Sequence, residues 1–497
     1  MNLHTDFHAQ AKTLKFETRA FIDGAYVAAQ SGETFETVNP ATGKLLANVA
    51  AGGAADVDVA VKAARRSFEA GSWSGLPPRE RKKVLLRFAD LIEKHSAELA
   101  LIETLDCGKP INDSINVDLP DSIETLRWHA EATDKIYDQV SPAPRDVVSM
   151  IVREPIGVVG GVIPWNFPLF VAMWKLAPAL AGGNSIVLKP AEQTSLSLIR
   201  LAALASEAGI PDGVFNVVPG LGPTAGQAIG LHRDIDCVSF TGSGEVGRLF
   251  LKYSADSNMK RIILECGGKS PAIVMGDIRN FAPIVENVAT GILFCQGENC
   301  SAGSRLIVHE SIKDQLLDQL KPVFESWTVG DPLERTTRIG AMIEQEHLAK
   351  VLSYIETGRK EGARIALGGS QILAGTGGSF IQPTIFDGVS NNMKIAREEI
   401  FGPVLSVITF KDEVEAVRLA NDTNYGLAAS LYTDDLNTAH RVAKQIRAGT
   451  VSVNCYSEGD FAVPFGGYKE SGFGGKDKGL AAHDQYTETK AVWIQLR

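Results

Sequence analysis

Apolar residues recur along this 497-residue chain with two alternating periods, and the alternation predicts an α/β fold. Between residues 158 and 265, short apolar runs predict strands at 158–163, 185–189, 214–218, 237–241 and 261–265. The stretches between them have a helical period and predict helices at about 169–180, 196–207, 223–231 and 245–254. Such βα repetition is typical of a parallel sheet covered by helices on both faces. Sheets of this kind bind ligands beyond the carboxyl ends of their strands.

The segments that flank this sheet are also patterned. Residues 21–27 predict a hairpin, because Asp23-Gly24 at its centre suits a tight turn. Amphipathic helices are expected at 56–68, 78–95 and about 119–136, whereas residues 1–18 are expected to form a loose tail. A second α/β pattern runs from Ala272 to about Asn454, with strands expected at 306–309, 404–409, 428–432 and 450–454.

Two strand-like segments lie outside both α/β patterns. Residues 146–154 leave the main body of the pattern, and residues 490–497 alternate apolar and polar side chains like an edge strand. An exposed edge strand needs a cover. We therefore expect a contact between subunits, and a homodimer or homotetramer.

Composition narrows the class of protein. The net charge of −10 argues against a nucleic-acid partner, since a phosphate-binding surface needs a basic excess. The polar N-terminus shows no signal peptide. Residues 156–183 are largely apolar, but Pro164, Lys175 and Pro178 favour a strand, a loop and a buried helix over a membrane span. The six cysteines show neither a disulfide framework nor a metal motif, so reduced thiols in a cytoplasmic protein are expected.

Cys300 is the first candidate for chemistry. It stands just after an apolar run that ends in a glycine-containing turn, and small residues follow it before the next strand. A cysteine on a turn between regular elements is accessible to a substrate, whereas most free cysteines only pack in a core. Cys300 is thus a candidate nucleophile, with core packing as the alternative.

Two motifs near the predicted sheet compete for Glu265. Gly242-Ser-Gly-Glu-Val-Gly247 follows a strand and opens a helix, which is the pattern of a dinucleotide-binding turn with Glu265 as ribose ligand. Glu265 also precedes two glycines at a strand end, where a carboxylate can serve as a general base. A plain ion pair between Glu265 and a lysine is the alternative.

Two further motifs follow predicted strands. Asn166 lies in Pro-Trp-Asn-Phe-Pro, a rigid loop that can direct the amide at a developing oxyanion. Lys189 and Glu192 are three residues apart after the next strand and can hold the hydroxyls of a ribose. The alternatives are a turn-capping asparagine and a surface salt bridge.

In this combination and order, the motifs resemble the NAD(P)-dependent aldehyde dehydrogenase superfamily. The resemblance covers about residues 21–497 and depends on Pro164-Trp-Asn-Phe-Pro168, Lys189-Pro-Ala-Glu192, Phe240-Thr-Gly-Ser243, Leu264-Glu-Cys-Gly-Gly-Lys269, the Cys300 segment, Glu398-Glu-Ile-Phe-Gly-Pro403 and Pro464-Phe-Gly-Gly-Tyr-Lys469. It implies a Rossmann-like NAD-binding domain (1–137 and 157–266), an α/β catalytic domain (267–468) and a small β oligomerisation arm (138–156 and 480–497).

The resemblance also implies roles for single residues. Cys300 is expected to be the nucleophile, Asn166 and the Cys300 backbone N–H the oxyanion hole, and Glu265 the base that activates water. Lys175 is expected to lie behind Asn166 as support. The residues expected to bind the cofactor are Ile163, Trp165, Lys189, Glu192, Gly222, Gly242, Ser243, Gly247, Glu399 and Phe401. Glu192 favours NAD over NADP, because a carboxylate beside the ribose repels a 2′-phosphate.

The substrate is predicted from the tunnel and its mouth. Aromatic residues are expected to line the tunnel, with core packing as the alternative: Phe167, Trp174, Tyr456, Phe461 and Phe465. Glu298, Glu458 and Asp460 are expected to make the mouth acidic. This resembles bacterial enzymes that oxidise 4-guanidinobutyraldehyde, 4-aminobutyraldehyde and γ-glutamyl-aminobutyraldehyde. We therefore expect a cationic ω-aminoaldehyde, with Asp460 facing the cation; a solvated acidic loop is the alternative.

Other functions remain open at this point. One is a broad-specificity aliphatic or aromatic aldehyde dehydrogenase. Another is a cysteine-dependent amidohydrolase or acyltransferase without redox chemistry, which would have no use for Lys189 and Glu192. The chain also departs from the family pattern. Cys295 stands where the family has asparagine, and Lys476-Asp477 stands where it has Arg-Glu, so that Asp477 is the candidate for the missing carboxylate.

Overall fold

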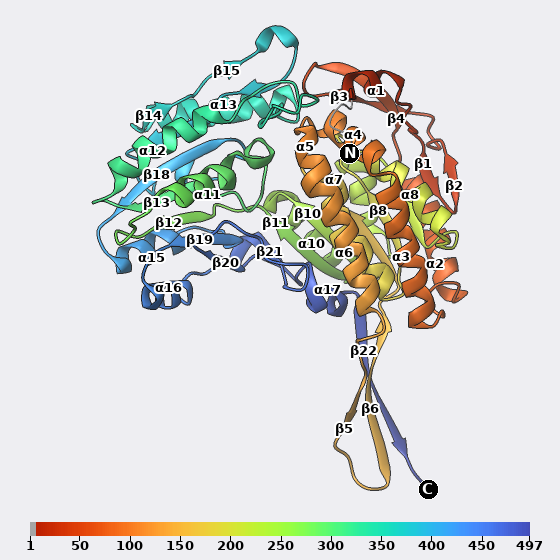
Figure 1. The fold of residues 1–497 in the computed structure, drawn as a ribbon. Helices are drawn as coiled ribbons and strands as arrows, with labels where there is room; N and C mark the ends of the chain where they lie inside the picture. Colours follow the sequence, from red (N-terminus) through yellow and green to blue (C-terminus); the bar gives the residue numbers. More distant parts are fainter. Residues whose placement is uncertain (1–5) are drawn as a thin grey trace.

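An eight-stranded sheet forms the centre of the first lobe in the computed structural model, which describes residues 6–497 (Figure 1). Its five parallel strands are those predicted from the apolar runs: β7 (Val158–Val162), β8 (Ser185–Lys189), β9 (Phe215–Val217), β10 (Cys237–Gly242) and β11 (Arg261–Cys266). The antiparallel pair β1 (Ala20–Ile22) and β2 (Ala25–Val27) extends one edge, and β21 (Gly472–Phe473) extends the other.

The strand order places a switch point in the middle of this sheet. From β7 the chain proceeds outward to β8 and β9, then returns to the other side of β7 for β10 and β11. A crevice opens where the order reverses, at the carboxyl ends of the strands. The loops that follow β7 and β10 carry Asn166 and Ser243, so both loops reach this crevice.

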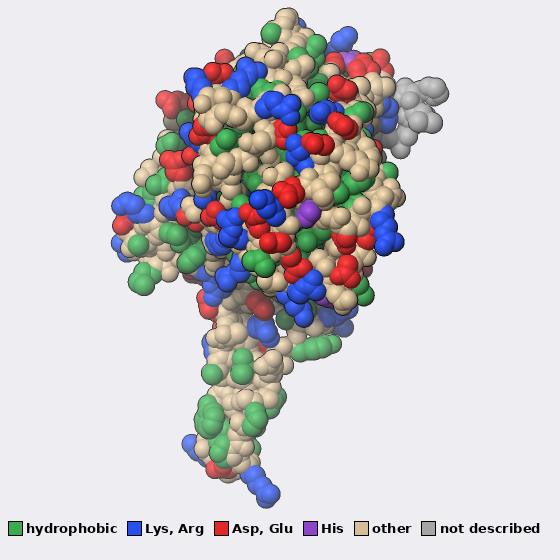
Figure 2. Space-filling model, turned by 90° about the vertical axis from the view of Figure 1, so that its left-hand side faces the viewer, with side chains coloured by type: hydrophobic (Ala, Val, Ile, Leu, Met, Phe, Trp, Pro, Cys, Tyr) green, Lys and Arg blue, Asp and Glu red, His purple; other side chains and the backbone are tan. Residues whose placement is uncertain are grey.

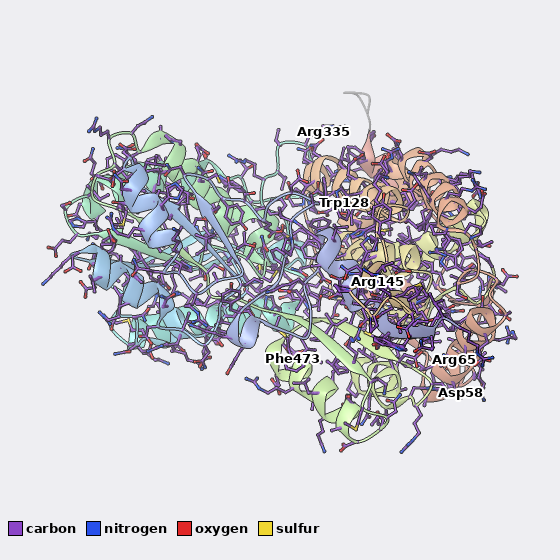
Figure 3. The ribbon with its side chains drawn as sticks, turned by 90° about the horizontal axis from the view of Figure 1, so that it is seen from below. Asp58, Arg65, Trp128, Arg145, Arg335 and Phe473 are labelled. Carbon is purple, nitrogen blue, oxygen red and sulfur yellow. The ribbon has the colours of Figure 1, made fainter. Side chains whose placement is uncertain are left out.

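Helices cover the sheet on both faces (Figure 1). The helices of this lobe are α2 (Ala54–Glu69), α3 (Pro78–Lys94), α4 (Ser96–Cys107), α5 (Ile111–Asp113), α6 (Leu119–Ala132), α7 (Pro168–Ala181), α8 (Leu196–Ala208), α9 (Gln227–Leu231) and α10 (Gly244–Ala255). Seen from below, the two lobes lie side by side, and Asp58 and Arg65 of α2 lie on the outer side of the first lobe (Figure 3).

The N-terminal segment differs from the prediction. The expected loose tail at residues 1–18 is wrong for its described part, because α1 (Phe7–Thr13) forms there; residues 1–5 lie outside the described residues. Asp6 caps this helix, and Phe7, 3% exposed, packs into the core under Arg335. The hairpin of β3 (Thr34–Asn39) and β4 (Lys44–Ala50) and helix α4 were also not predicted.

A seven-stranded sheet forms the second lobe. Its order is β14 (Arg364–Leu367), β17 (Thr384–Asp387), β18 (Val404–Phe410), β13 (Arg305–His309), β12 (Pro271–Val274), β19 (Ala428–Tyr432) and β20 (Thr450–Val453). Its helices are α11 (Ala282–Leu293), α12 (Lys313–Ser326), α13 (Gln345–Lys360), α14 (Lys394–Arg397), α15 (Glu413–Asn421) and α16 (Leu436–Ala443), and a small ribbon consists of β15 (Gln371–Ile372) and β16 (Phe380–Ile381).

A three-stranded ribbon projects from the body (Figure 1). β22 (Thr487–Gln495) follows the short helix α17 (Gly479–Gln485) and pairs antiparallel with β6 (Val147–Pro155), which also pairs with β5 (Gln139–Ser141). Val140 is 77% exposed and Trp493 is 63% exposed, and Figure 2 shows apolar side chains along the ribbon. Within one chain, these apolar side chains are left without a cover.

Residues 6–497 contain neither a candidate membrane-spanning helix nor a candidate metal cluster. None of the helices there combines the length and the apolar character that crossing a membrane requires. Nor do three or more His, Cys, Asp or Glu side chains in that range gather in a way that could hold a metal ion.

We predict that Arg305 is essential for the stability of the second lobe. Its guanidinium is fully buried at the start of β13 and donates to the carbonyl oxygens of Lys269, Leu419 and Ala420 at 2.9, 3.0 and 3.0 Å. Arg305→Met leaves these buried acceptors unsatisfied, so urea denaturation should show a loss of about 3 kcal/mol or more in the free energy of unfolding. The exposed Arg359→Met is the matched control, expected to change it by less than about 0.5 kcal/mol. Equal stability of the two variants would contradict the prediction.

Candidate active site

A cavity of about 230 Å³ lies between the two lobes and brings about half of the predicted site residues together. The first lobe contributes the loops after β7 and β10. The second lobe contributes the turn that carries Cys300 and the loop that carries Glu399 and Phe401. The predicted residues that line it are Trp165, Asn166, Phe167, Trp174, Gly242, Ser243, Cys300, Glu399 and Phe401.

A left-handed turn directs Cys300 into this cavity. Cys295, Gln296 and Gly297, just after α11, have φ angles of 50°, 56° and 72°. A β-carbon on Gly297 would lie 2.5 Å from the backbone nitrogen of Pro403, so only glycine fits there. Cys295 and Gln296 adopt a conformation that non-glycine residues rarely take, and such strain needs support from the surrounding structure.

Thiol and amide hydrogen bonds join this turn to the Asn166 loop. Asn166 Nδ2 donates to the Glu298 carbonyl oxygen at 2.8 Å, and Cys295 Sγ donates to the Asn166 carbonyl oxygen at 3.6 Å. Cys107 Sγ donates to the neighbouring carbonyl oxygen of Trp165 at 3.3 Å. The bond to Glu298 uses one N–H of the Asn166 amide, and a second N–H remains for a ligand in the cavity.

Burial and nearby carboxylates act against ionisation of Cys300. Burial is the largest cause that raises the pKa of its thiol well above the ordinary value, and Glu458, Glu265 and Glu399 add to the effect. Each of these carboxylates disfavours a second negative charge nearby. The thiol is therefore protonated at neutral pH in the free protein, although the thiolate is the reactive form.

Glu265 lies outside the cavity lining, in a buried polar cluster at the end of β11. Burial and then Asp477 raise the pKa of its carboxyl well above the ordinary value, while Lys175 and Lys476 oppose this. Its Oε1 has no hydrogen-bond partner among residues 6–497. Lys175, predicted to lie behind Asn166, forms a fully buried ion pair with Asp477 at 3.2 Å. Asp477 thus occupies the neighbourhood of Glu265.

The residues predicted to bind a dinucleotide divide into two groups. Trp165, Gly242, Ser243, Glu399 and Phe401 line the cavity, whereas the rest lie outside its lining: Ile163, Lys189, Glu192, Gly222 and Gly247. In the first group, Ser243 Oγ accepts the N–H of Val246 at 3.3 Å and so caps α10. Glu399 Oε1 accepts the Gly268 N–H at 2.8 Å.

The second group contains a polar pair, Lys189 and Glu192, and two glycines with different surroundings. At the end of β8, Lys189 Nζ lies 3.2 Å from Glu192 Oε2, and the backbone N–H of Ile163 donates to the Lys189 carbonyl oxygen. Gly222 has open space around its missing side chain. A β-carbon on Gly247 would lie 3.2 Å from Cys266 Sγ, so this glycine permits close packing of α10 on β11.

These residues fit a dinucleotide. The N-terminus of a twelve-residue helix, α10, opens beside the crevice at Ser243, and such a terminus suits a pyrophosphate. The Thr241 hydroxyl on the same rim is buried and finds no protein partner within residues 6–497. Lys189 ends β8, on the other side of β7, and Glu192 follows it, at strand ends where a ribose is bound in folds of this type.

A second, outer chamber of about 320 Å³ adjoins the cavity. The two chambers share Phe167, Phe170, Asn299 and Glu458 in their linings. The outer chamber adds charged and aromatic residues: Asp121, Phe294, Tyr456, Asp460, Phe461 and Lys478. Asp460 is exposed and lines only this chamber.

Three sequence expectations need correction or refinement. Glu298 does not acidify the mouth: it is 1% exposed, its Oε1 accepts the Ile343 N–H at 3.0 Å, and burial raises the pKa of the carboxyl well above the ordinary value. Phe465, predicted to contact substrate, is fully buried and packs 4.8 Å behind Trp174. Glu458, rather than Asp460, is the mouth carboxylate that reaches the inner cavity.

His347 was missed by the sequence analysis, since none of the motifs contains a histidine. It lines the cavity from α13, and its Nε2 contacts the Phe401 carbonyl oxygen at 2.6 Å. Burial lowers the pKa of its imidazole to about 4, so the ring is neutral at physiological pH. It supports Phe401, whose φ of 60° is left-handed. Because α13 lies far from the motifs in sequence, only the fold reveals this contact.

Comparisons with known proteins agree with this geometry. A model described as the aldehyde dehydrogenase family matches residues 26–492. An aminoacetaldehyde dehydrogenase of Pseudomonas aeruginosa is 54% identical over 489 residues, which cover 98% of each chain. The NADP/NAD-dependent aldehyde dehydrogenase PuuC of Escherichia coli K12 is 49% identical over 100% of both chains.

Solved structures show the same fold. A mutant of the indole-3-acetaldehyde dehydrogenase AldA of P. syringae, in complex with NAD+ and IAA, superposes with a TM-score of 0.98 at 52% identity, and the match covers 99% of each chain. The predicted fold class and family are thereby confirmed. The chain belongs to the aldehyde dehydrogenase family of oxidoreductases.

Proposed function

We propose that this protein oxidises aldehydes to carboxylic acids with NAD, through covalent intermediates on Cys300, and that cationic ω-aminoaldehydes are its preferred substrates. The observation that carries the proposal is a continuous pair of chambers. The inner one holds Cys300 and Asn166, and the outer one holds three carboxylates.

The chemistry follows from the side chains. The Cys300 thiolate attacks the aldehyde carbon, and the resulting oxyanion accepts hydrogen bonds from the free N–H of Asn166 and from the Cys300 backbone N–H. NAD, when bound, is the acceptor for the hydride that leaves this carbon as the thioester forms. Ionised Glu265 then removes a proton from the water that attacks the thioester, and the carboxylic acid is released.

The cofactor would be held at the crevice of the first lobe. Lys189 and Glu192 would hold the adenosine ribose, the start of α10 the pyrophosphate, and Glu399 and Phe401 the nicotinamide half. Glu192 favours NAD over NADP, since its carboxylate accepts a ribose hydroxyl and repels a phosphate. The P. syringae relative is an NAD+ complex, whereas the E. coli relative is named for both cofactors.

The charge of the outer chamber supports a cationic substrate. Of the residues in the range 6–497, Asp121, Glu458 and Asp460 line it together with a single cation, Lys478. Lys478 Nζ donates to the backbone carbonyls of Glu458 and Gly459 at 3.1 and 3.3 Å, so its hydrogen bonds go to the backbone. The P. aeruginosa relative is named for aminoacetaldehyde, which agrees with this charge.

A second candidate is a broader preference that includes neutral aromatic aldehydes. The inner cavity is walled by the aromatic rings of Phe167, Phe170 and Trp174, with Phe170 and Trp174 centroids 4.8 Å apart. The P. syringae relative is named for indole-3-acetaldehyde. Aromatic walls alone do not select for charge, so the outer carboxylates decide between the two candidates.

The arm, which is the three-stranded ribbon of β5, β6 and β22, and the free thiols support two further proposals. The exposed apolar side chains of Val140 and Trp493 suit a contact between arms, so we propose a homodimer or homotetramer. All six cysteines are free, which suits the reducing conditions of the cytoplasm.

Steady-state kinetics test the proposed function. With NAD, we expect kcat/KM for 4-aminobutyraldehyde and 4-guanidinobutyraldehyde to exceed that for a neutral alkanal of matched length by about tenfold, equivalent to about 1.4 kcal/mol. NADH absorbance gives the rates, and NADP should support a lower rate. Equal values for neutral and cationic aldehydes would favour the broader candidate, and an absence of NADH formation with every aldehyde would overturn the proposal.

Substitutions test the roles of Cys300 and Asn166. Cys300→Ser should lower kcat by about 10⁴-fold or more, because the nucleophile is lost. Asn166→Ala should lower it by about 10²- to 10³-fold, through loss of one oxyanion donor. Cys455→Ser, at an exposed cysteine outside both chambers, is the control and should retain the activity. Substantial activity in Cys300→Ser would exclude this cysteine as nucleophile.

The pH profile tests the role of Glu265. As a base it acts only when ionised, so the rate should rise with pH through its raised pKa. Asp477→Asn removes the like charge that helps to raise this pKa and leaves Lys175 uncompensated. The acid limb of kcat should then move to lower pH, by about one unit. Asp484→Asn, at an exposed position on α17, should leave the limb in place. A limb that stays unmoved, or moves upward, in Asp477→Asn would refute the assignment.

A further inference from the structure

Glu458 lies where the two chambers meet, directly beside the catalytic turn. Among the described residues 6–497, it is the one charged side chain that lines both chambers. It accepts a short hydrogen bond from the hydroxyl of Ser301, the residue that follows Cys300. A ligand that bridges the chambers must therefore pass Glu458.

Hydrogen bonds fix this carboxylate relative to Cys300. Ser301 Oγ also contacts Tyr456 Oη at 2.8 Å, and Asn299 Nδ2 donates to the same Tyr456 oxygen at 2.9 Å. The Ser301 backbone N–H donates to Asn299 Oδ1 at 3.1 Å. The bond from Ser301 occupies Glu458 Oε1, and Oε2 has no hydrogen-bond partner among residues 6–497. These hydrogen bonds thus hold the Glu458 carboxylate in a fixed position, with one oxygen open to a ligand.

The charges around Cys300 make Glu458 the carboxylate that a substrate can reach. Glu458, Glu265 and Glu399 all disfavour the thiolate. Glu265 is buried beside Lys175 and Lys476, and Glu399 accepts the Gly268 N–H; neither lines the outer chamber. Of these three carboxylates, Glu458 is therefore the one that a cation entering through the outer chamber can reach.

The outer chamber supplies the remaining charges near Glu458. Lys478 lies over the rings of Trp174 and Phe465 at 5.6 Å from each centroid and is bound to backbone carbonyls. Asp121 carries a pKa raised to about 6 by burial, Asp118 and Glu458, with Lys478 opposing. Asp460 is exposed at the outer rim. Carboxylates outnumber the one cation, so a second cation is attracted rather than repelled.

We propose that a cationic substrate group bound at Glu458 promotes ionisation of Cys300, so that recognition of the substrate also activates the nucleophile. This inference rests on the proposed role of Cys300. The bound ammonium offsets the negative charge of Glu458, which otherwise opposes the thiolate, and the thiol proton leaves to solvent. A neutral aldehyde offers no such charge and meets a thiol that stays protonated.

Alkylation of Cys300 tests the proposal in the full-length protein without cofactor or aldehyde. Iodoacetamide reacts with the thiolate, and mass spectrometry of the Cys300 peptide reports its rate across a pH series. The probes are n-butylammonium and, as a neutral control of similar shape, 1-butanol. Three proteins are compared: the unaltered chain, Glu458→Gln and Asp460→Asn.

We expect n-butylammonium, and not butanol, to lower the apparent alkylation pKa of the unaltered chain by about one unit, which raises the rate below that pKa by up to about tenfold. Asp460→Asn should keep this response. Glu458→Gln should lose it and should also have a lower apparent pKa without amine, a shift that a merely structural role for Glu458 would not cause.

Three results would overturn the proposal: no response to the amine in the unaltered chain, a retained response in Glu458→Gln, or a lost response in Asp460→Asn. These outcomes do not decide whether the proposed function is correct. Aldehyde oxidation without an amine response would refute this inference alone. Failure to oxidise any aldehyde would refute the proposed function even if the thiol responds to the amine.

Discussion

Three successive left-handed residues, Cys295 to Gly297, decide where the reactive thiol stands. They end the path of α11 and turn the chain so that Cys300 enters the space between the lobes. The turn is strained, and it is supported by contacts with the Asn166 loop from the other lobe. The turn and the Asn166 loop therefore form one hydrogen-bonded unit, which fixes Cys300 relative to Asn166. Cys295, where the family pattern has asparagine, keeps a hydrogen bond in this unit through its thiol.

The charges around Cys300 disfavour its thiolate form. Carboxylates from three segments, Glu265, Glu399 and Glu458, lie near the partly exposed Cys300. Each also has a proposed role: Glu265 in proton transfer, Glu399 in cofactor contact and Glu458 in substrate contact. Their shared effect is to raise the pKa of the Cys300 thiol. A resting thiol is also less prone to oxidation than a thiolate.

Local patterns predicted much of the fold and many of the candidate site residues. The five parallel strands followed from apolar runs, and Asn166 and Cys300 from loops at strand or helix ends, because both depend on residues close in sequence. The sequence-based expectations that were wrong or incomplete concern residues whose surroundings depend on packing between segments far apart in the chain. Glu298 is a plausible acid by sequence, yet its side chain is buried and accepts the Ile343 N–H. His347 reaches the site from α13, an element that carries none of the motifs. Phe7 gains its helix through contact with the core.

The covalent intermediate on Cys300 is the central claim, and a trapped acyl-enzyme tests it most directly. Glu265→Gln should form the thioester but fail to hydrolyse it. Mixed with NAD and an aldehyde, this variant should release about one NADH per active site and then stop, and peptide mass spectrometry should find the acyl group on Cys300. An acyl group on another cysteine, or steady turnover with no acyl-enzyme, would contradict the account.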